Sequence, residues 1–203
     1  MATKKNTKVK IKEEALNLFS TLGFAGGSVR DIGRKAGVRE SALYNYFSSK
    51  EAILLELIQD AKNNSTDLNL LTDELLEYLS KPKIFIEKFV DVLFNYWNDE
   101  IQKKYLRLIL IEQFRDSSSN NISVNLLIEE TISIWEMIFS QMLNYKFIKN
   151  NDARILAEEF VYPLFMLRLQ FLTKDSVDWE SLSKKLESHV NYFWNSIKKQ
   201  NEY

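Results

Sequence analysis

The sequence predicts an all-α protein with two parts, a small N-terminal domain over residues 1–50 and a larger helical domain over residues 51–203. Residues that form turns are scarce, because the 203 residues include only two prolines and five glycines. All five glycines lie within residues 23–37, so breaks in the rest of the chain are few. Apolar residues recur at helical spacing over most of the remaining sequence, and no segment has the alternating pattern of a strand.

The first helix is expected from Val9 to Leu22, after a polar and basic arm over residues 1–8 that is expected to be disordered. Gly23 is expected to end this helix, because glycine adopts helix-terminating conformations without a steric penalty. The inner face of the helix is predicted to contain Ile11, Ala15, Leu18 and Phe19.

Two short helices joined by a tight turn are expected within residues 28–50. Ser28 is suited to cap the first of them, and Gly37 is suited to end it in a left-handed conformation. The second carries Leu43 and Phe47 on one face and polar or aromatic residues on the other. This arrangement predicts a helix-turn-helix, whose second helix fits the DNA major groove. The expected core of the N-terminal domain is Leu16, Phe19, Phe24, Val29, Ile32, Ala36, Val38, Leu43 and Phe47.

The string I-G-x-x-A-G-V-x-x-x-A-L-Y-x-Y-F-x-x-K-E over residues 32–51 resembles the signature of the TetR family of transcriptional repressors. The resemblance covers about residues 8–57 without gaps, and beyond them only the chain length and helix pattern agree. It implies an N-terminal three-helix DNA-binding domain followed by a helical bundle for ligand binding and dimerisation. It also implies that Tyr44, Tyr46 and Lys50 contact phosphates.

Three residues depart from the pattern of that family. Gly33 stands where alanine is usual, which costs helix stability of up to about 1 kcal/mol. Arg39 stands where a small capping residue is usual, and Ala42 stands where relatives often carry a hydroxyl. These departures affect the affinity and the preferred DNA sequence rather than the motif itself.

The exposed polar residues of the helix-turn-helix have side chains that can read base edges. Arg39 can pair with guanine, Asn45 with adenine, and Glu40 can accept a hydrogen bond from cytosine. Ser28 can offer a phosphate its hydroxyl and a helix N-terminus. The alternative is that the tyrosines pack and the arginines are solvated charges. The predicted DNA-binding residues are Ser28, Arg30, Arg39, Glu40, Ser41, Ala42, Tyr44, Asn45, Tyr46 and Lys50.

The charge distribution supports a nucleic-acid partner. Residues 1–50 contain ten Lys and Arg against four Asp and Glu, whereas residues 51–203 contain 17 against 24. A basic module joined to an acidic body is typical of proteins that bind double-stranded DNA. The alternative is that the basic N-terminus only keeps the protein soluble.

Further helices are expected over residues 51–80, 84–98, 100–115, 124–144, 152–172 and from 178 onward. The first of these contains a polar stretch at residues 62–67 that is a weak point, and Pro82 is expected to stop it. A loop is expected at residues 116–121. Pro163 is expected to kink the helix that contains it. Either Asn151 or Asp152 is suited to cap the helix before the last, and Asp178 is suited to cap the last.

Aromatic residues are concentrated after residue 50, where 21 of the 26 lie. This density suggests a cavity for an apolar or aromatic small molecule, and the family resemblance implies that such a molecule releases the DNA. An ordinary aromatic core is an equal alternative. Arg168 can pair with an anionic ligand if it points inward, or it can lie on a surface. The predicted ligand-binding residues are Trp97, Tyr105, Phe114, Trp135, Phe139, Phe165 and Arg168.

The last two helices have broad apolar faces, which predict a homodimer with a four-helix interface. Two-fold pairing would place two helix-turn-helix motifs about one DNA turn apart and require a palindromic operator. The predicted interface residues are Leu156, Phe160, Leu164, Leu167, Phe171, Leu182, Leu186, Val190, Phe193 and Ile197.

The residue types argue against an enzyme. There is no cysteine and a single histidine, His189, so a His/Cys metal site or a Ser-His triad lacks parts, and we expect no catalytic residue, metal or cofactor. No segment reads as a membrane span or a signal peptide, so a cytoplasmic location is expected. The sequence thus predicts a ligand-responsive DNA-binding regulator, most simply a repressor. The alternatives are an activator or a helical protein-interaction module.

Overall fold

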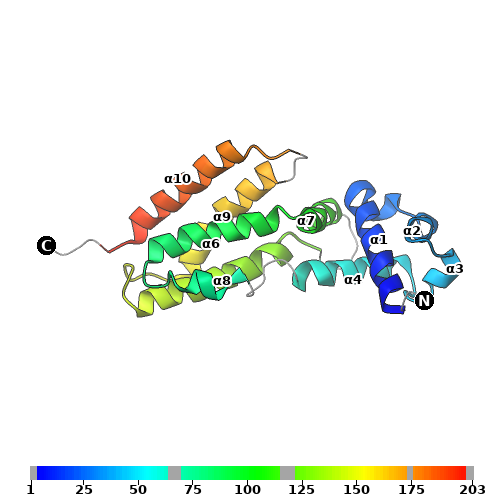
Figure 1. Cartoon of the computed structure of the whole chain (residues 1–203), viewed down its shortest axis with the longest axis horizontal. Helices are drawn as coiled ribbons and strands as arrows, with labels where there is room; N and C mark the ends of the chain where they lie inside the picture. Colours follow the sequence, from blue (N-terminus) through cyan, green and yellow to red (C-terminus); the bar gives the residue numbers. More distant parts are fainter. Residues whose placement is uncertain (1–3, 64–69, 115–121, 173–175, 200–203) are drawn as a thin grey trace. The chain divides into compact units, whose positions relative to one another are not determined.

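The computed structural model describes residues 4–63, 70–114, 122–172 and 176–199, and these are almost entirely helical (Figure 1). The predicted all-α class is confirmed. Within those ranges the sole β pairing is an isolated bridge between Ile148 and Lys198. The predicted loop at residues 116–121 lies outside them.

The chain divides into two compact units. The first unit contains Met1–Asn64 and Glu100–Leu126, and the second contains Ser65–Asp99 and Leu127–Tyr203. The sequence places a domain boundary after residue 50, which stays a prediction.

The first unit is built on the helix α1, which packs against α2, α4 and α7. Its core lies where α1 meets the two helices of the helix-turn-helix, and Phe19, Ile32 and Leu43 are fully buried there. Phe24, Val29 and Val38, which the sequence assigns to this core, are only half-buried. The helices of this unit are α1 (Lys4–Gly26), α2 (Val29–Ala36), α3 (Glu40–Leu43), α4 (Lys50–Asn63) and α7 (Glu100–Glu112).

The N-terminal arm is helical from Lys4, so the prediction of disorder is wrong from that residue onward. Lys8 of this arm and Lys12 just after it form ion pairs with acidic residues of α4. Lys8 Nζ lies 2.7 Å from Glu56 Oε1, and Lys12 forms an ion pair with Asp60. These pairs join α1 to α4, which explains why the helix extends toward the N-terminus.

Gly23 interrupts α1 with φ 70° and ψ 168°, which confirms the predicted end of the first regular segment. This left-handed backbone is easily adopted only by glycine. One further helical turn follows, up to Gly26.

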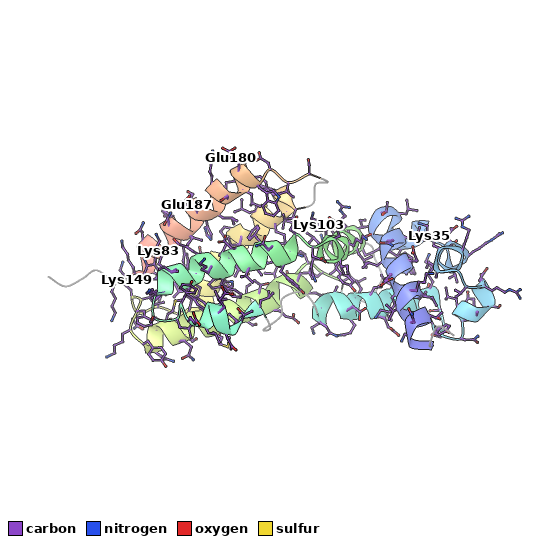
Figure 2. All side chains as sticks on the ribbon, in the orientation of Figure 1. Lys35, Lys83, Lys103, Lys149, Glu180 and Glu187 are labelled. Carbon is purple, nitrogen blue, oxygen red and sulfur yellow. The ribbon has the colours of Figure 1, made fainter. Side chains whose placement is uncertain are left out.

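The second unit is a helical bundle whose helices contact one another through aromatic side chains and ion pairs. Phe89 of α6 lies 5.1 Å from Trp135 of α8 between ring centroids, and α10 packs against α6 and α9. Glu180 and Glu187 project from the exposed side of α10 (Figure 2). The helices are α5 (Asp73–Leu76), α6 (Pro82–Trp97), α8 (Asn125–Asn144), α9 (Ala153–Phe171) and α10 (Trp179–Ile197).

The helix expected over residues 51–80 is two helices, which corrects the prediction. α4 ends at Asn63, and α5 begins after Thr72, whose hydroxyl accepts a hydrogen bond from Leu75 N at 3.3 Å. A threonine cap starts a new helix, because it satisfies a backbone donor that has no partner inside the helix. Pro82 occupies the first turn of α6, where its missing N–H costs nothing.

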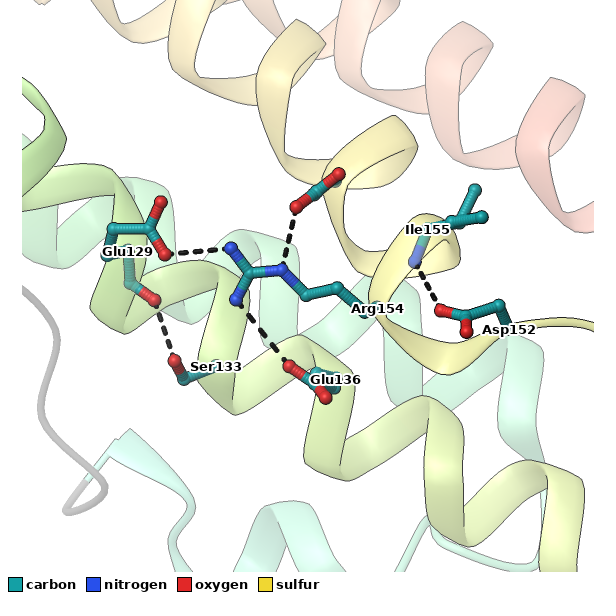
Figure 3. A network of polar contacts seen from close by, with 7 residues as sticks. Glu129, Ser133, Glu136, Asp152, Arg154 and Ile155 are labelled. Carbon is teal, nitrogen blue, oxygen red and sulfur yellow. Dashed lines mark hydrogen bonds and ion pairs between the residues drawn. The ribbon is translucent and has the colours of Figure 1, made fainter.

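Arg154 of α9 contacts three carboxylates, and the two that lie on α8, Glu129 and Glu136, link the two helices (Figure 3). It donates to Glu158 Oε1 at 2.7 Å and to Glu129 Oε2 at 2.8 Å, and its guanidinium lies 3.6 Å from Glu136. The hydrogen bond to Glu129 is the largest of the contacts that raise the pKa of Arg154 above its ordinary value.

The caps predicted for the last two helices are confirmed. Asp152 accepts from Ile155 N and Asp178 accepts from Ser181 N, both at 3.0 Å. Pro163 lies inside α9, as expected. No helix in the described ranges has the length and hydrophobicity needed to span a membrane.

Candidate nucleic-acid interface

The first helix of the helix-turn-helix, α2, is defined by residues at its two ends. Ser28 has an extended backbone, and its Oγ accepts a hydrogen bond from Asp31 N at 3.0 Å. Gly37 ends the helix in the left-handed region, with φ 72° and ψ 27°. Both roles were predicted, and they turn the chain sharply toward α3.

The turn between α2 and α3 is unusually close. A Cβ on Gly33 would lie 3.0 Å from the carbonyl oxygen of Val38, closer than most side-chain contacts. The absence of a side chain at Gly33 therefore lets the turn pack directly on α2. This gives a structural role to one of the three departures from the family pattern.

The second helix, α3, is shorter than predicted, because its regular part ends at Leu43. A hydrogen-bonded turn continues the path, and Phe47 N donates to Leu43 O at 3.1 Å. Arg39 begins α3 without a side-chain cap, since a guanidinium has no acceptor to offer. Leu43 and Phe47 are buried and hold this short element on α1 and α2.

Most residues predicted to contact DNA lie on the outer surface. Arg39, Glu40, Ser41 and Asn45 are exposed, and the side chain of Tyr44 is 49% exposed. Arg30 is also exposed, whereas Ala42 and Tyr46 are half-buried. No DNA is present, so their roles stay predictions.

Two predicted phosphate contacts already have partners inside the protein. Lys50 Nζ donates to Gly27 O at 2.6 Å and lies 4.2 Å from the ring centroid of Phe24. Ser28 Oγ donates to Asp31 Oδ2 at 2.6 Å. That hydrogen bond from Ser28 is the main reason why the pKa of Asp31 is lowered, so the N-terminus of α2 already holds a negative charge.

Sequence reasoning missed Arg34 and Lys35, which extend the basic surface. Arg30 and Arg34 are four residues apart on α2, a spacing that puts them on one face of a helix. They line a surface hollow, together with Ser28, Asp31, Val38, Arg39 and Glu40. Lys35 is exposed on the same helix (Figure 2). The i,i+4 spacing was the available signal for Arg34.

This geometry agrees with what is found in known proteins. The model of the family described as bacterial regulatory proteins, tetR family, matches residues 11–57. A solved transcriptional regulator from Aquifex aeolicus superposes with a TM-score of 0.65 at 26% identity, covering 92% of this chain and 98% of that one. Over residues 11–57 the chain therefore matches the TetR family.

Two HTH-type transcriptional regulators match in sequence over part of their length. YdgC, an uncharacterized HTH-type transcriptional regulator of Bacillus subtilis, is 40% identical over 67 residues, 33% of each chain. IcaR of Staphylococcus aureus, the HTH-type negative transcriptional regulator of the biofilm operon icaADBC, is 27% identical over 119 residues. That match covers 57% of this chain and 59% of IcaR, so these relatives are matched over less than two thirds of their length.

The residues predicted to bind an effector are divided between the two units. In the second unit, Trp97, Phe165 and Arg168 cluster together, with the two rings 6.4 Å apart. Trp135 and Phe139 belong to a separate aromatic core of the same unit. The other two candidates, Tyr105 and Phe114, are in the first unit, and Phe114 is 86% exposed.

The second unit also contains an apolar hollow of about 480 Å³ that none of those candidates lines. It lies among α5, α6 and α8, and sequence reasoning missed it, because its lining is assembled from three elements. Its lining residues are Leu71, Leu76, Leu79, Ser80, Phe85, Met137, Ile138, Gln141, Met142, Tyr145 and Phe147.

The residues predicted to form a dimer interface are mostly buried within one chain. Nine of the ten are buried, and only Leu167 is half-exposed. The apolar stripe of α10 therefore packs inside its own bundle. The large apolar residues that α9 and α10 leave exposed are instead Ile155, Tyr162, Met166, Trp179 and Tyr192.

His189, the single histidine, is held inside the second unit, with Nε2 2.9 Å from Phe160 O. Its burial lowers its pKa, although the contact with Phe160 O acts in the opposite direction. No cluster of three His, Cys, Asp or Glu side chains that could hold a metal ion occurs in the described part of the chain.

Proposed function

We propose that this chain is a ligand-responsive transcriptional repressor. It binds a palindromic operator as a homodimer, in the cytoplasm where that DNA lies, and leaves it when a small apolar or aromatic effector binds the second unit. Regulatory function is supported by the family, and repression by the similarity to IcaR, a negative regulator. An enzymatic role has no comparable support.

DNA binding rests on one observation, the exposed polar surface of the helix-turn-helix. Leu43 and Phe47 are buried and hold the short second helix against the rest of the unit. Arg39, Glu40 and Asn45 are exposed and can therefore contact base edges. Arginines on α2 add positive charge for the phosphates.

The dimer is supported by the exposed apolar residues of α9 and α10. Tyr162, Met166 and Tyr192 are each at least half exposed, at 50%, 54% and 79%. Large apolar side chains gathered on the outside of two neighbouring helices are a common dimer surface. Changing Met166 to Glu is expected to convert a dimer into a monomer in light scattering, with Glu180→Ala as the control on α10.

The experiment that tests DNA binding is fluorescence anisotropy against labelled duplexes that tile the DNA beside the gene, at two salt concentrations. We expect one duplex to bind tightly, with a steep loss of affinity as salt rises. Arg39→Ala should weaken binding by about 1–3 kcal/mol, which is roughly 5- to 150-fold. The control is Lys199→Ala, an exposed basic residue that follows α10 in the second unit.

Weak binding that does not depend on sequence would contradict the proposal if it persists on duplexes from the whole genome. Equal effects of Arg39→Ala and Lys199→Ala would show that the helix-turn-helix is not the contact surface. A duplex bound by one chain alone would contradict the palindromic operator.

A further inference from the structure

Arg168 is the most unusual polar residue of the second unit. It lies near the end of α9, and only 1% of it is exposed. Its Nε, Nη1 and Nη2 atoms have no hydrogen-bond acceptor among the described residues. An arginine carries five N–H donors, so this side chain is buried with its full donor capacity unused.

The neighbours of Arg168 offset its charge but do not bind its hydrogens. The guanidinium carbon lies 4.7 Å from the ring centroid of Trp97 and 5.8 Å from that of Phe165. Cation–π contacts of this kind stabilise a positive charge without supplying an acceptor in the plane of the guanidinium. The Trp97 Nε1 atom is itself buried without an acceptor.

The charge is nevertheless present at neutral pH. Burial lowers the pKa of Arg168 to about 9, which is still well above 7. A buried cation without a hydrogen-bonded partner is strongly unfavourable. By contrast Arg154, on the same helix, is surrounded by three carboxylates.

We propose that the effector carries a carboxylate, which the Arg168 guanidinium binds in the core of the second unit. A guanidinium binds a carboxylate through two parallel hydrogen bonds, and Trp97 Nε1 can add a third donor to the same anion. The rings of Trp97 and Phe165 then contact the apolar body of the effector. This inference rests on the proposed effector response and specifies its chemistry as an apolar or aromatic carboxylate.

The close packing around Arg168 connects binding to a change of structure. Trp97 of α6 is fully buried and Phe165 of α9 is 5% exposed. A carboxylate that reaches the guanidinium must move at least one of these rings. Binding therefore changes the side-chain packing between α6 and α9, which is the kind of differential contact that a conformational response requires.

The test uses thermal unfolding of the full chain and of two matched variants, Arg168→Met and Arg154→Met. Methionine keeps an unbranched apolar side chain and removes the charge. Because the Arg168 guanidinium has no hydrogen-bond acceptor among the described residues, Arg168→Met should raise the unfolding midpoint of the ligand-free protein. Arg154→Met should lower it, because it breaks the ion pairs.

The probes are the sodium salts of acetate, butyrate, hexanoate, octanoate and benzoate. The matching primary alcohols and sodium chloride at equal ionic strength serve as controls. At least one carboxylate should raise the midpoint of the wild type, by about 5–10 °C at a hundredfold excess over its Kd. The alcohols should not, and Arg168→Met should abolish the shift.

Three results would overturn the inference. Arg168→Met could lower the midpoint as Arg154→Met does, which would mean that the guanidinium is satisfied inside the fold. The carboxylates could shift the unfolding midpoints of the wild type and of Arg168→Met equally, or no carboxylate could raise the midpoint of the wild type more than chloride does.

Operator binding measured on the same samples separates the two proposals. If the protein binds DNA but carboxylates do not shift its unfolding midpoint, only the proposal of a carboxylate effector is refuted. If carboxylates shift the midpoint but the protein does not bind DNA, only the proposal of a repressor is refuted.

Discussion

Replacing Glu112 with alanine should release the segment that joins α1 to α2. Glu112 lies at the end of α7 and is 4% exposed, and its Oε1 accepts a hydrogen bond from Phe24 N at 2.7 Å. That N–H follows the break at Gly23, where the hydrogen-bond ladder of α1 is interrupted. The contact therefore takes over the role of a helical hydrogen bond.

The size of the effect follows from the geometry of this contact. A hydrogen bond to a charged group contributes about 1.5–3 kcal/mol when its acceptor is buried. Phe24 is half-exposed, so water can partly replace the lost acceptor, and about 1.5–2 kcal/mol is the better expectation. For a chain of this length that is a fall of about 3–8 °C in the unfolding midpoint.

The assay is urea unfolding followed by circular dichroism, together with hydrogen exchange at the amide of Phe24. Glu112→Gln retains an oxygen acceptor and should lose less than half as much stability as Glu112→Ala. The exposed Glu13 of α1 provides the control, Glu13→Ala. A Glu112→Ala protein within about 0.5 kcal/mol of the wild type would refute the reasoning. So would rapid exchange of the Phe24 amide in the wild type.

Three further changes have predictable results. Gly37→Ala should cost about 1–2 kcal/mol in urea unfolding, because a Cβ opposes the left-handed backbone, and Gly37→Asn should cost less; equal costs would contradict this. Arg154→Ala should cost only about 1 kcal/mol, since the side chain is 35% exposed and solvent screens its ion pairs; an unchanged midpoint in low salt would contradict it. The pKa of His189 is lowered by burial, so the folded protein binds fewer protons than the unfolded chain, and stability falls as pH drops below about 6.5. His189→Gln should lose less stability than the wild type between pH 7.5 and 5.5, and parallel curves would refute this.

The helix-turn-helix was predicted well because its signals are local. Ser28 caps and Gly37 terminates α2 through contacts with residues only three or four positions away, so their identities suffice. The same holds for Asp152 and Asp178 in the second unit. The disordered arm was predicted wrongly, because the pairing of Lys8 with Glu56 joins residues 48 positions apart.

The candidate site residues show the limit of pattern reading. Helical spacing correctly marks Leu186 and Val190 as apolar-facing, but it does not say which neighbour covers them. They pack inside their own bundle, and the exposed apolar surface is on other residues, such as Met166 and Tyr192. Aromatic content likewise did not reveal the hollow among α5, α6 and α8.

The sequence by itself determined the all-α class, the helix-turn-helix and the ends of several helices, because periodicity, caps and glycine conformations act over a single turn. Only the tertiary structure decided that Glu112 accepts a hydrogen bond from the backbone of Phe24, and that Arg168 is buried with no acceptor in the described part of the chain. These depend on which helices pack together. The apolar periodicity of a helix determines which of its faces is buried. The packing of the helices against one another determines which partner each buried polar group contacts.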